Sequence, residues 1–119
     1  MSNYQNEDQF EKLLTKSTEV ISGEFEVKDA NALMDLDITD RIFKDCKIFG
    51  GDFCSSSFIN CTFDNVLFRN LALVGVSFNN CNFIKCKFSN IQTDFSMRNC
   101  KVDGLTITRE AENCYTKQN

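Results

Sequence analysis

The sequence predicts an all-β solenoid, a four-sided parallel β-helix of about three and a half coils with an N-terminal α-helical cap. Three observations predict this fold. Phenylalanine recurs at every fifth residue, as at Phe53, Phe58, Phe63 and Phe68. Small or medium apolar residues lie two positions before these centres, and turn-forming residues lie two positions after them. A period of five fits neither a helix, with apolar residues three and four apart, nor a strand, with apolar residues two apart.

The first region, residues 1–35, is expected to cap the solenoid. A stripe of apolar residues predicts a helix over residues 7–21, formed by Phe10, Leu13, Leu14, Val20 and Ile21. Gly23 ends this predicted helix, and the sequence EFEVK then alternates as a short strand does. An open solenoid end exposes apolar core and unpaired strand edges, so we expect the helix and strand to cover the first coil.

The second region, residues 36–107, carries the repeat. Its central residues are large and apolar: Ile38, Phe43, Ile48, Phe53, Phe58, Phe63, Phe68, Leu73, Phe78, Phe83 and Phe88. Two residues after each centre we expect a corner: Asp40, Asp45, Gly50, Ser55, Asn60, Asn65, Asn70, Gly75, Asn80, Lys85 and Asn90. All of these except Lys85 are turn formers, which tolerate the left-handed region or bond to their own backbone. With four sides in a coil, residues twenty apart stack at the inter-strand spacing of about 4.8 Å.

The repeat loses one residue in the segment SNIQTDFS, residues 89–96. When one residue is dropped there, the pattern resumes, with corners expected at Asp94, Asn99 and Gly104. We therefore expect a local distortion of the solenoid in this segment.

The segments DCKIFGGDFCSSSFINCTFDNVLFRN and NNCNFIKCKFSN resemble the pentapeptide repeat family. Units of that family centre on Leu or Phe, with Ala, Cys, Ser or Val two residues earlier and Asn, Asp or Gly at the corners. The resemblance covers residues 36–107 and implies a right-handed quadrilateral parallel β-helix. This chain uses Cys more than Ala and Phe more than Leu, and both changes keep the interior filled. The remaining residues, 108–119, are expected to form a polar C-terminal tail.

The predicted structural core consists of stacked aromatic rings and thiols: Phe53, Phe58, Phe63, Phe68, Phe78, Phe83, Phe88, Cys61, Cys81 and Cys100. Cys46 and Cys86 occupy the same small inward position. The cysteines could form a metal site or a redox switch, or they could fill space as small apolar residues. The chain has no His and no CxxC pair, so we expect the filling role and no metal. Cys54 points outward and Cys114 lies in the tail, which makes them the candidate reactive thiols.

Catalysis is not expected, so we predict no catalytic and no cofactor-binding residues. Without His the usual general base is missing, and the acidic residues are spread over corners and outer faces. No glycine-rich loop is present to hold a phosphate. The start MSNYQNEDQF lacks an apolar signal-peptide core, and no apolar run is long enough to span a bilayer. These features predict a cytoplasmic, non-enzymatic protein that does not bind membranes.

The predicted function is a non-catalytic interaction module, a rigid solenoid that binds a protein partner as an inhibitor, immunity factor or adaptor. Outward-facing apolar residues give a possible partner surface: Phe49, Cys54, Ile59, Leu67, Val74 and Ile84. Lys47 and Lys87 lie in the same outward column as Leu67. The C-terminal end of the solenoid lacks a predicted helix. Either the tail folds over this end, giving a monomer, or two molecules form a dimer through it.

The family resemblance also implies an alternative function, because some pentapeptide repeat proteins are DNA mimics that modulate DNA gyrase or topoisomerase. Residues 1–35 hold eight acidic residues against three lysines, whereas residues 36–107 hold seven acidic and eight basic residues. Mimicry of a duplex requires dense negative charge along the solenoid, which this distribution does not provide. Direct nucleic-acid binding is not expected either, since no basic patch with exposed aromatic residues is evident.

Overall fold

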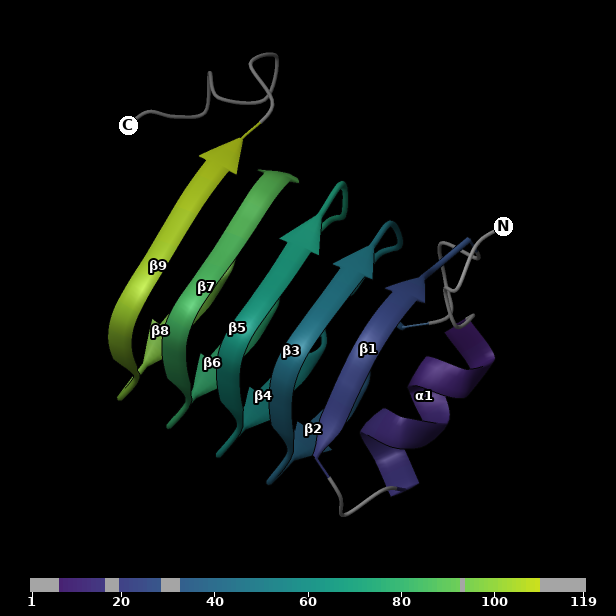
Figure 1. The fold of residues 1–119 in the computed structure, drawn as a ribbon, viewed down its shortest axis with the longest axis horizontal. Coiled ribbons are helices and arrows are strands. Elements are labelled where there is room, and N and C mark those ends of the chain that lie inside the picture. The colour runs from purple at the N-terminus through teal and green to yellow at the C-terminus, as the bar shows by residue number, and fades with distance from the viewer. Residues whose placement is uncertain (1–6, 17–19, 29–32, 93, 110–119) are drawn as a thin grey trace.

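In the computed structural model the chain forms a parallel β-solenoid of about four turns with one short helix at its N-terminal end (Figure 1). The structure describes residues 7–16, 20–28, 33–92 and 94–109. The elements are α1 (Glu7–Lys16), β1 (Ile21–Glu26), β2 (Asp37–Thr39), β3 (Ile42–Phe49), β4 (Ser57–Ile59), β5 (Thr62–Arg69), β6 (Ser77–Asn79), β7 (Asn82–Ile91), β8 (Ser96–Arg98) and β9 (Lys101–Arg109).

Two parallel sheets form the walls, in the orders β1-β3-β5-β7-β9 and β2-β4-β6-β8. The longer strands bend at a corner and so supply two sides of each coil, while the short strands supply a third side (Figure 1). On the fourth side, isolated bridges join Asp52 to Ala72 and Ala72 to Gln92. Phe43 pairs with Phe63, and Phe63 pairs with Phe83, which is the predicted stacking of residues twenty apart. The prediction of a parallel β-helix is confirmed.

The corners have the backbone conformation that their residue types predict. All eleven positions from Asp40 to Asn90 named above have positive φ, and so do Asn99 and Gly104. The left-handed region turns the chain sharply, and Asn, Asp and Gly tolerate it at the lowest cost. Lys85 adopts the same conformation, with φ of 53°, although its side chain has no such preference.

The predicted distortion in residues 89–96 is confirmed, and the lost residue lies at the corner beside Asp94. The Gly75 amide donates to the Asp94 carbonyl at 3.0 Å, in the same relation as Ser55 to Val74. The Ser96 amide then donates to the carbonyl of Val76. In the preceding coil the Ser77 amide donates to the carbonyl of Ser56, so the later bond spans one residue fewer along the chain.

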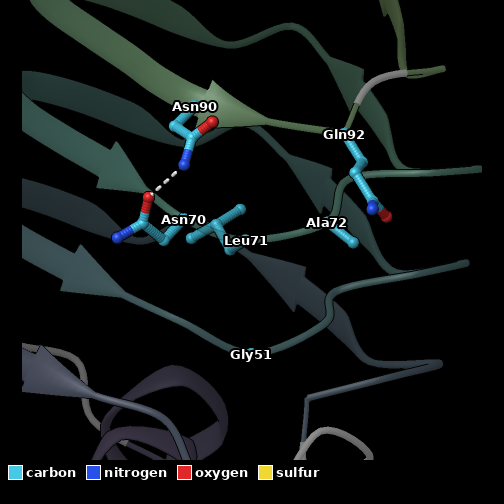
Figure 2. Close-up of a pocket in the computed structure, with 6 residues that line it drawn as sticks. All are labelled: Gly51, Asn70, Leu71, Ala72, Asn90 and Gln92. Carbon is cyan, nitrogen blue, oxygen red and sulfur yellow. Dashed lines mark hydrogen bonds between the residues drawn. The ribbon is translucent and has the colours of Figure 1, made fainter. Parts of the chain in front are cut away.

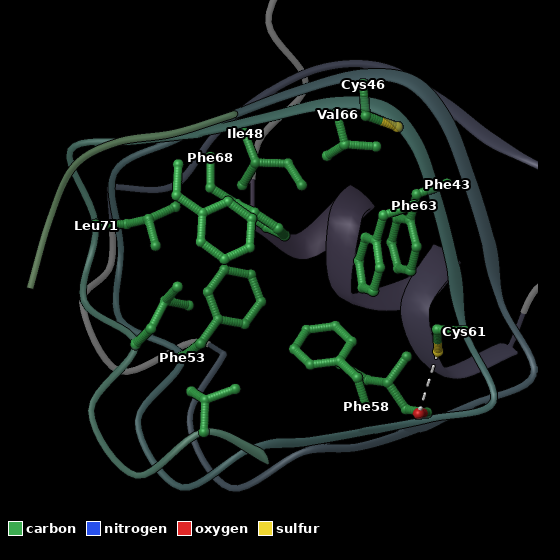
Figure 3. Packing of buried hydrophobic residues seen from close by; sticks show 14 of the residues in the cluster. Phe43, Cys46, Ile48, Phe53, Phe58, Cys61, Phe63, Val66, Phe68 and Leu71 are labelled. Carbon is green, nitrogen blue, oxygen red and sulfur yellow. Dashed lines mark hydrogen bonds between the residues drawn. The ribbon is translucent and has the colours of Figure 1, made fainter. Parts of the chain in front are cut away.

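Stacked phenylalanine rings fill the tube (Figure 3). The ring centroids of Phe43 and Phe63 lie 4.8 Å apart, and those of Phe63 and Phe83 lie 5.0 Å apart, with interplanar angles of 6° and 7°. Phe58 and Phe78 stack at 5.0 Å in the neighbouring column. Rings in adjacent columns meet edge to face, an arrangement that aromatic pairs favour.

The N-terminal end of the tube is covered by α1 and β1. Phe10 of α1 is buried and stacks on Phe25 of β1 at 4.3 Å between centroids. Leu14 is also buried, and its carbonyl accepts a hydrogen bond of 2.9 Å from Arg41 Nε. This bond satisfies one of the free carbonyls in the last turn of the helix.

The helix is shorter than the predicted range of residues 7–21, because α1 ends at Lys16. Ile21 lies instead in β1, where it pairs with Phe43 and is buried, and Val20 is 51% exposed. The prediction was wrong for these two residues. A β-branched side chain suits a strand, and pairing with β3 outweighs the helical spacing of Ile21.

Ser56 is a buried polar residue in an inward position, and we predict that its hydroxyl is required for stability. Ser56 Oγ donates to the Leu33 carbonyl at 2.7 Å and accepts from the Leu36 amide at 3.0 Å. Replacement by alanine, Ser56→Ala, leaves both backbone groups without this partner and should lower the free energy of unfolding by about 1–3 kcal/mol. Urea denaturation measures the change.

The matched control is Ser57→Ala, one residue along the chain, where the half-exposed hydroxyl accepts a hydrogen bond from Ser77 Oγ. This change should cost about 0.5 kcal/mol or less. Equal losses for the two variants would contradict the role assigned to Ser56.

Candidate interaction surfaces

The described part of the chain contains no group of three or more His, Cys, Asp or Glu side chains arranged to hold a metal ion. Its hollows are shallow. The one in Figure 2 has a volume of about 200 Å³ and lies where Gly51 supplies no side chain beside Leu71 and Gln92. Asn90 Nδ2 donates to Asn70 Oδ1 at 2.6 Å within it, and no acidic or basic side chain lines it. This hollow therefore offers no group for acid–base chemistry.

Five cysteines at the small inward position donate to backbone carbonyls of the preceding turn. Cys81 Sγ lies 3.4 Å from the Phe58 carbonyl oxygen, and Cys86 Sγ lies 3.2 Å from that of Phe63. Burial raises the pKa of the Cys46 thiol to about 12. The hydrogen bond that the Cys81 thiol donates to the neighbouring Cys61 sulfur, together with burial, also raises the pKa of Cys81. Because the thiolate is the reactive form, Cys46 and Cys81 are unreactive at neutral pH.

The two candidate reactive thiols have different outcomes. Cys54 is half-buried, and burial together with the neighbouring Asp52 carboxylate raises its pKa. A raised pKa lowers the thiolate fraction, so the environment of Cys54 does not activate it. Cys114 lies outside the described residues. Cys100, predicted to be in the core, is half-buried because it belongs to the last described coil.

The structure places the seven predicted core phenylalanines, Cys61 and Cys81 in the buried interior. The six residues of the possible partner surface all face outward or lie half-buried, but they do not form one patch. Ile59 is on β4 and pairs with Thr39 of β2 and Asn79 of β6. Ile84 is on the part of β7 that precedes its corner at Lys85. Cys54 and Val74 stack on the fourth side, and Phe49 and Leu67 are diagonal neighbours on β3 and β5. The apolar outward residues are thus divided among the sides of the solenoid.

The C-terminal end of the described solenoid presents its interior to solvent. We define the end face as the inward residues of the last coil: Phe95, Met97, Cys100, Val102, Leu105 and Ile107. Val102 is 52% exposed and Ile107 is 37% exposed, whereas Phe83 and Phe88, one coil earlier, are fully buried. In the described structure β8 and β9 are also the edge strands of their sheets. The end face combines apolar side chains with unpaired backbone groups.

A second surface lies on the wall formed by β3, β5 and β7. Lys47, Leu67 and Lys87 are paired neighbours across these strands, and Lys85 lies at the adjacent corner. They surround a hollow of about 450 Å³ whose lining is completed by Asp45, Cys46, Asn65 and Val66. We call these eight residues the basic hollow. Its cationic side chains outnumber its one carboxylate.

Two of these features were not recognised from the sequence. Lys85 was expected at a corner, but its unfavourable residue type was not interpreted as a sign of function. The exposure of Val102 and Ile107 follows from their position in the last coil and not from their residue type, which is that of a core residue.

Comparison with solved structures supports the fold. A trypsin-treated variant of QnrB1, described as a plasmid-mediated fluoroquinolone resistance protein, matches with a TM-score of 0.63 and 24% sequence identity. The match covers 72% of this chain and 44% of that chain, so this chain corresponds to less than half of QnrB1. No family model matches the chain, and no curated protein is significantly similar to it. No helix in the described residues is long and apolar enough to cross a membrane.

We predict an alkaline loss of stability that depends on Cys46. The pKa of Cys46 is about 12 in the folded protein and 9.0 in its unperturbed state. Between these values the unfolded thiol is deprotonated while the folded thiol keeps its proton. Cys46 should therefore lower the free energy of unfolding by about 1.4 kcal/mol per pH unit in this range, with no effect below about pH 9.

Urea denaturation of the wild type and Cys46→Ala across this pH range tests the prediction, and the slope should be smaller in the variant. Val66→Ala is the control, because Val66 stacks directly on Cys46 and does not titrate. Identical slopes for the wild type and Cys46→Ala would refute the assignment.

Proposed function

We propose that this protein is a non-catalytic interaction module that binds a protein partner, as an inhibitor, immunity factor or adaptor. The observation that carries this proposal is the filled interior. Stacked rings such as Phe63 and Phe83 occupy the tube, so a ligand can bind only to the outside. A rigid β-solenoid loses little conformational freedom on binding, which favours recognition by a preformed surface.

The free thiols support a cytoplasmic location. Six described cysteines are free, among them the neighbouring pair Cys61 and Cys81. Unpaired cysteines in this number are typical of a reducing compartment. We include this location in the proposal.

Site-specific photo-crosslinking in the native host tests the general proposal. A photoreactive amino acid is placed at Leu67, at Val102 or, as a control, at Ile42, which is 48% exposed on another arm of the same sheet. We expect one protein partner to be crosslinked from Leu67 or Val102 and not from Ile42. Absence of any specific product from both test positions would refute the proposal.

The likeness to a fluoroquinolone resistance protein favours a second candidate, a modulator of DNA gyrase or topoisomerase acting as a DNA mimic. The described wall of β3, β5 and β7 argues against mimicry, because Lys47, Arg69, Lys85 and Lys87 are among its exposed residues. We predict no inhibition of gyrase supercoiling, and no protection against a fluoroquinolone, at about micromolar protein. Inhibition or protection in this assay would favour the second candidate over an unrelated partner.

We further propose that the end face binds a second copy of this chain. Residues 110–119 contain few apolar residues, whereas an identical end face supplies an equally apolar surface and matching strand edges. An association of this kind is isologous and closes as a two-fold dimer.

For this dimer we predict that Val102→Asp weakens self-association by about tenfold or more, because it buries a carboxylate in the interface. Analytical ultracentrifugation measures the dissociation constant. Ile42→Asp is the control, since it introduces the same charge at a position of similar exposure and should leave association unchanged. A wild type that is monomeric at all concentrations would refute the dimer.

A further inference from the structure

The basic hollow carries three cationic side chains that are weakly compensated. Lys47 Nζ lies 3.8 Å from Glu24 Oε2, and both side chains are more than 40% exposed, so this pair is weak. Within the described residues, Lys85 and Lys87 form no ion pair. The Asp45 carboxylate accepts a hydrogen bond of 2.7 Å from Asn65 Nδ2. The hollow therefore has an excess of positive charge facing solvent.

Lys85 is unusual for its backbone position. Every other non-glycine residue with positive φ among the described residues is Asp, Asn or Ser. Asp45 and Asn65 precede Lys85 in the same corner column and share its conformation without a comparable cost. A residue held in an unfavourable conformation is a sign of a functional requirement. Lys85 places a positive charge in the same hollow as Leu67.

Leu67 is the second unusual residue in the hollow. It is an outward-facing leucine, half-buried, and its direct neighbours in the sheet are Lys47 on β3 and Lys87 on β7. The two lysines lie two strand spacings apart, about 10 Å. The side chains of Lys47 and Lys87 are both exposed, and both line the same hollow as Leu67. The column thus presents an apolar centre between two positive charges.

We propose that the basic hollow binds an extended acidic peptide segment of the protein partner, with an apolar side chain on Leu67 and carboxylates on Lys47 and Lys87. In an extended segment, residues two apart point to the same side, so the fitting pattern is acidic-x-apolar-x-acidic. The two acidic residues of this pattern are about 13 Å apart, whereas the backbones at Lys47 and Lys87 are about 10 Å apart. The long lysine side chains can bridge this difference of about 3 Å. Lys85 would bind a further carboxylate. This inference rests on the proposed function and names the chemistry of its partner.

The hollow fits a peptide better than a nucleic acid. Binding of single strands relies on aromatic side chains on which bases stack, and the hollow is lined by Leu67 and Val66 with no aromatic residue. A carboxylate peptide with an apolar residue uses both the lysines and the leucine.

NMR titration of the ¹⁵N-labelled full chain with the peptide Gly-Glu-Ala-Leu-Ala-Glu-Gly, at low salt, tests the proposal. We expect binding with a Kd of about 1 mM or tighter, and chemical-shift changes centred on Lys47, Leu67 and Lys87. The double variant Lys47→Gln/Lys87→Gln should weaken binding about fivefold. The control Lys101→Gln, on the exposed first arm of β9, should leave it unchanged.

Lys85→Asn separates function from folding. Asparagine is the residue found at most of the non-glycine corners, so this variant should unfold at a higher urea concentration than the wild type. It should nevertheless bind the peptide about twofold more weakly. A variant that is both more stable and equally tight in binding would overturn the role of Lys85.

Three outcomes overturn the proposal as a whole. These are no binding of the peptide, equal binding of a peptide with Ser in place of Leu, and tighter binding of a thymidine oligonucleotide through the same lysines. The last outcome would indicate a polyanion site. If the peptide fails while crosslinking from Val102 identifies a protein partner other than a second copy of this chain, the interaction module stands and only the acidic-peptide site is refuted.

Discussion

The repeated alignment of side chains at the spacing of parallel strands is the constraint on which this structure depends. Phe63 can stack flat on Phe83 at 5.0 Å only if the backbone between them returns to the same point one strand spacing away. Left-handed corners make that return possible in a closed four-sided path. The residue types at the corners, the strand pairing and the ring stacking therefore depend on one another, and a change in one of them alters the other two.

The shortened turn at Asp94 shows what this condition permits. The residue is lost at a corner, and stacking is kept on both sides of it, since Ala72 still bridges Gln92 and Phe78 still pairs with Met97. Phe95 enters the inward position that Val76 holds one coil earlier, and its ring meets those of Phe78 and Phe88 at 5.7 Å. A larger side chain thus compensates for a smaller coil. Corners are the places where the path length can change without disrupting a column.

The interior was predictable from the sequence because its cause is periodic. Phe58 and Phe78 could be assigned to one column by counting, and Asn60 and Asn80 to one corner. Three other features depend on tertiary context, and counting alone did not reveal them. Ile21 fits a helical stripe but pairs with Phe43 in a strand. Val102 has the character of a core residue but is exposed because it lies in the last coil. The surface residues were recognised as outward-facing, but their division among four sides required the structure.

A solenoid also changes how functional residues are recognised. Exposed apolar residues such as Ile59 carry little information, because β-branched side chains suit any strand face. Corners carry more, because most side chains are disfavoured there. A lysine at a left-handed corner costs about 1 kcal/mol relative to asparagine, and every other described non-glycine residue with positive φ is Asp, Asn or Ser. In the proposed complex with an acidic peptide, contact between Lys85 and a carboxylate offsets part of this cost. The lysine at this corner is therefore the main observation behind the proposed peptide site beside Leu67.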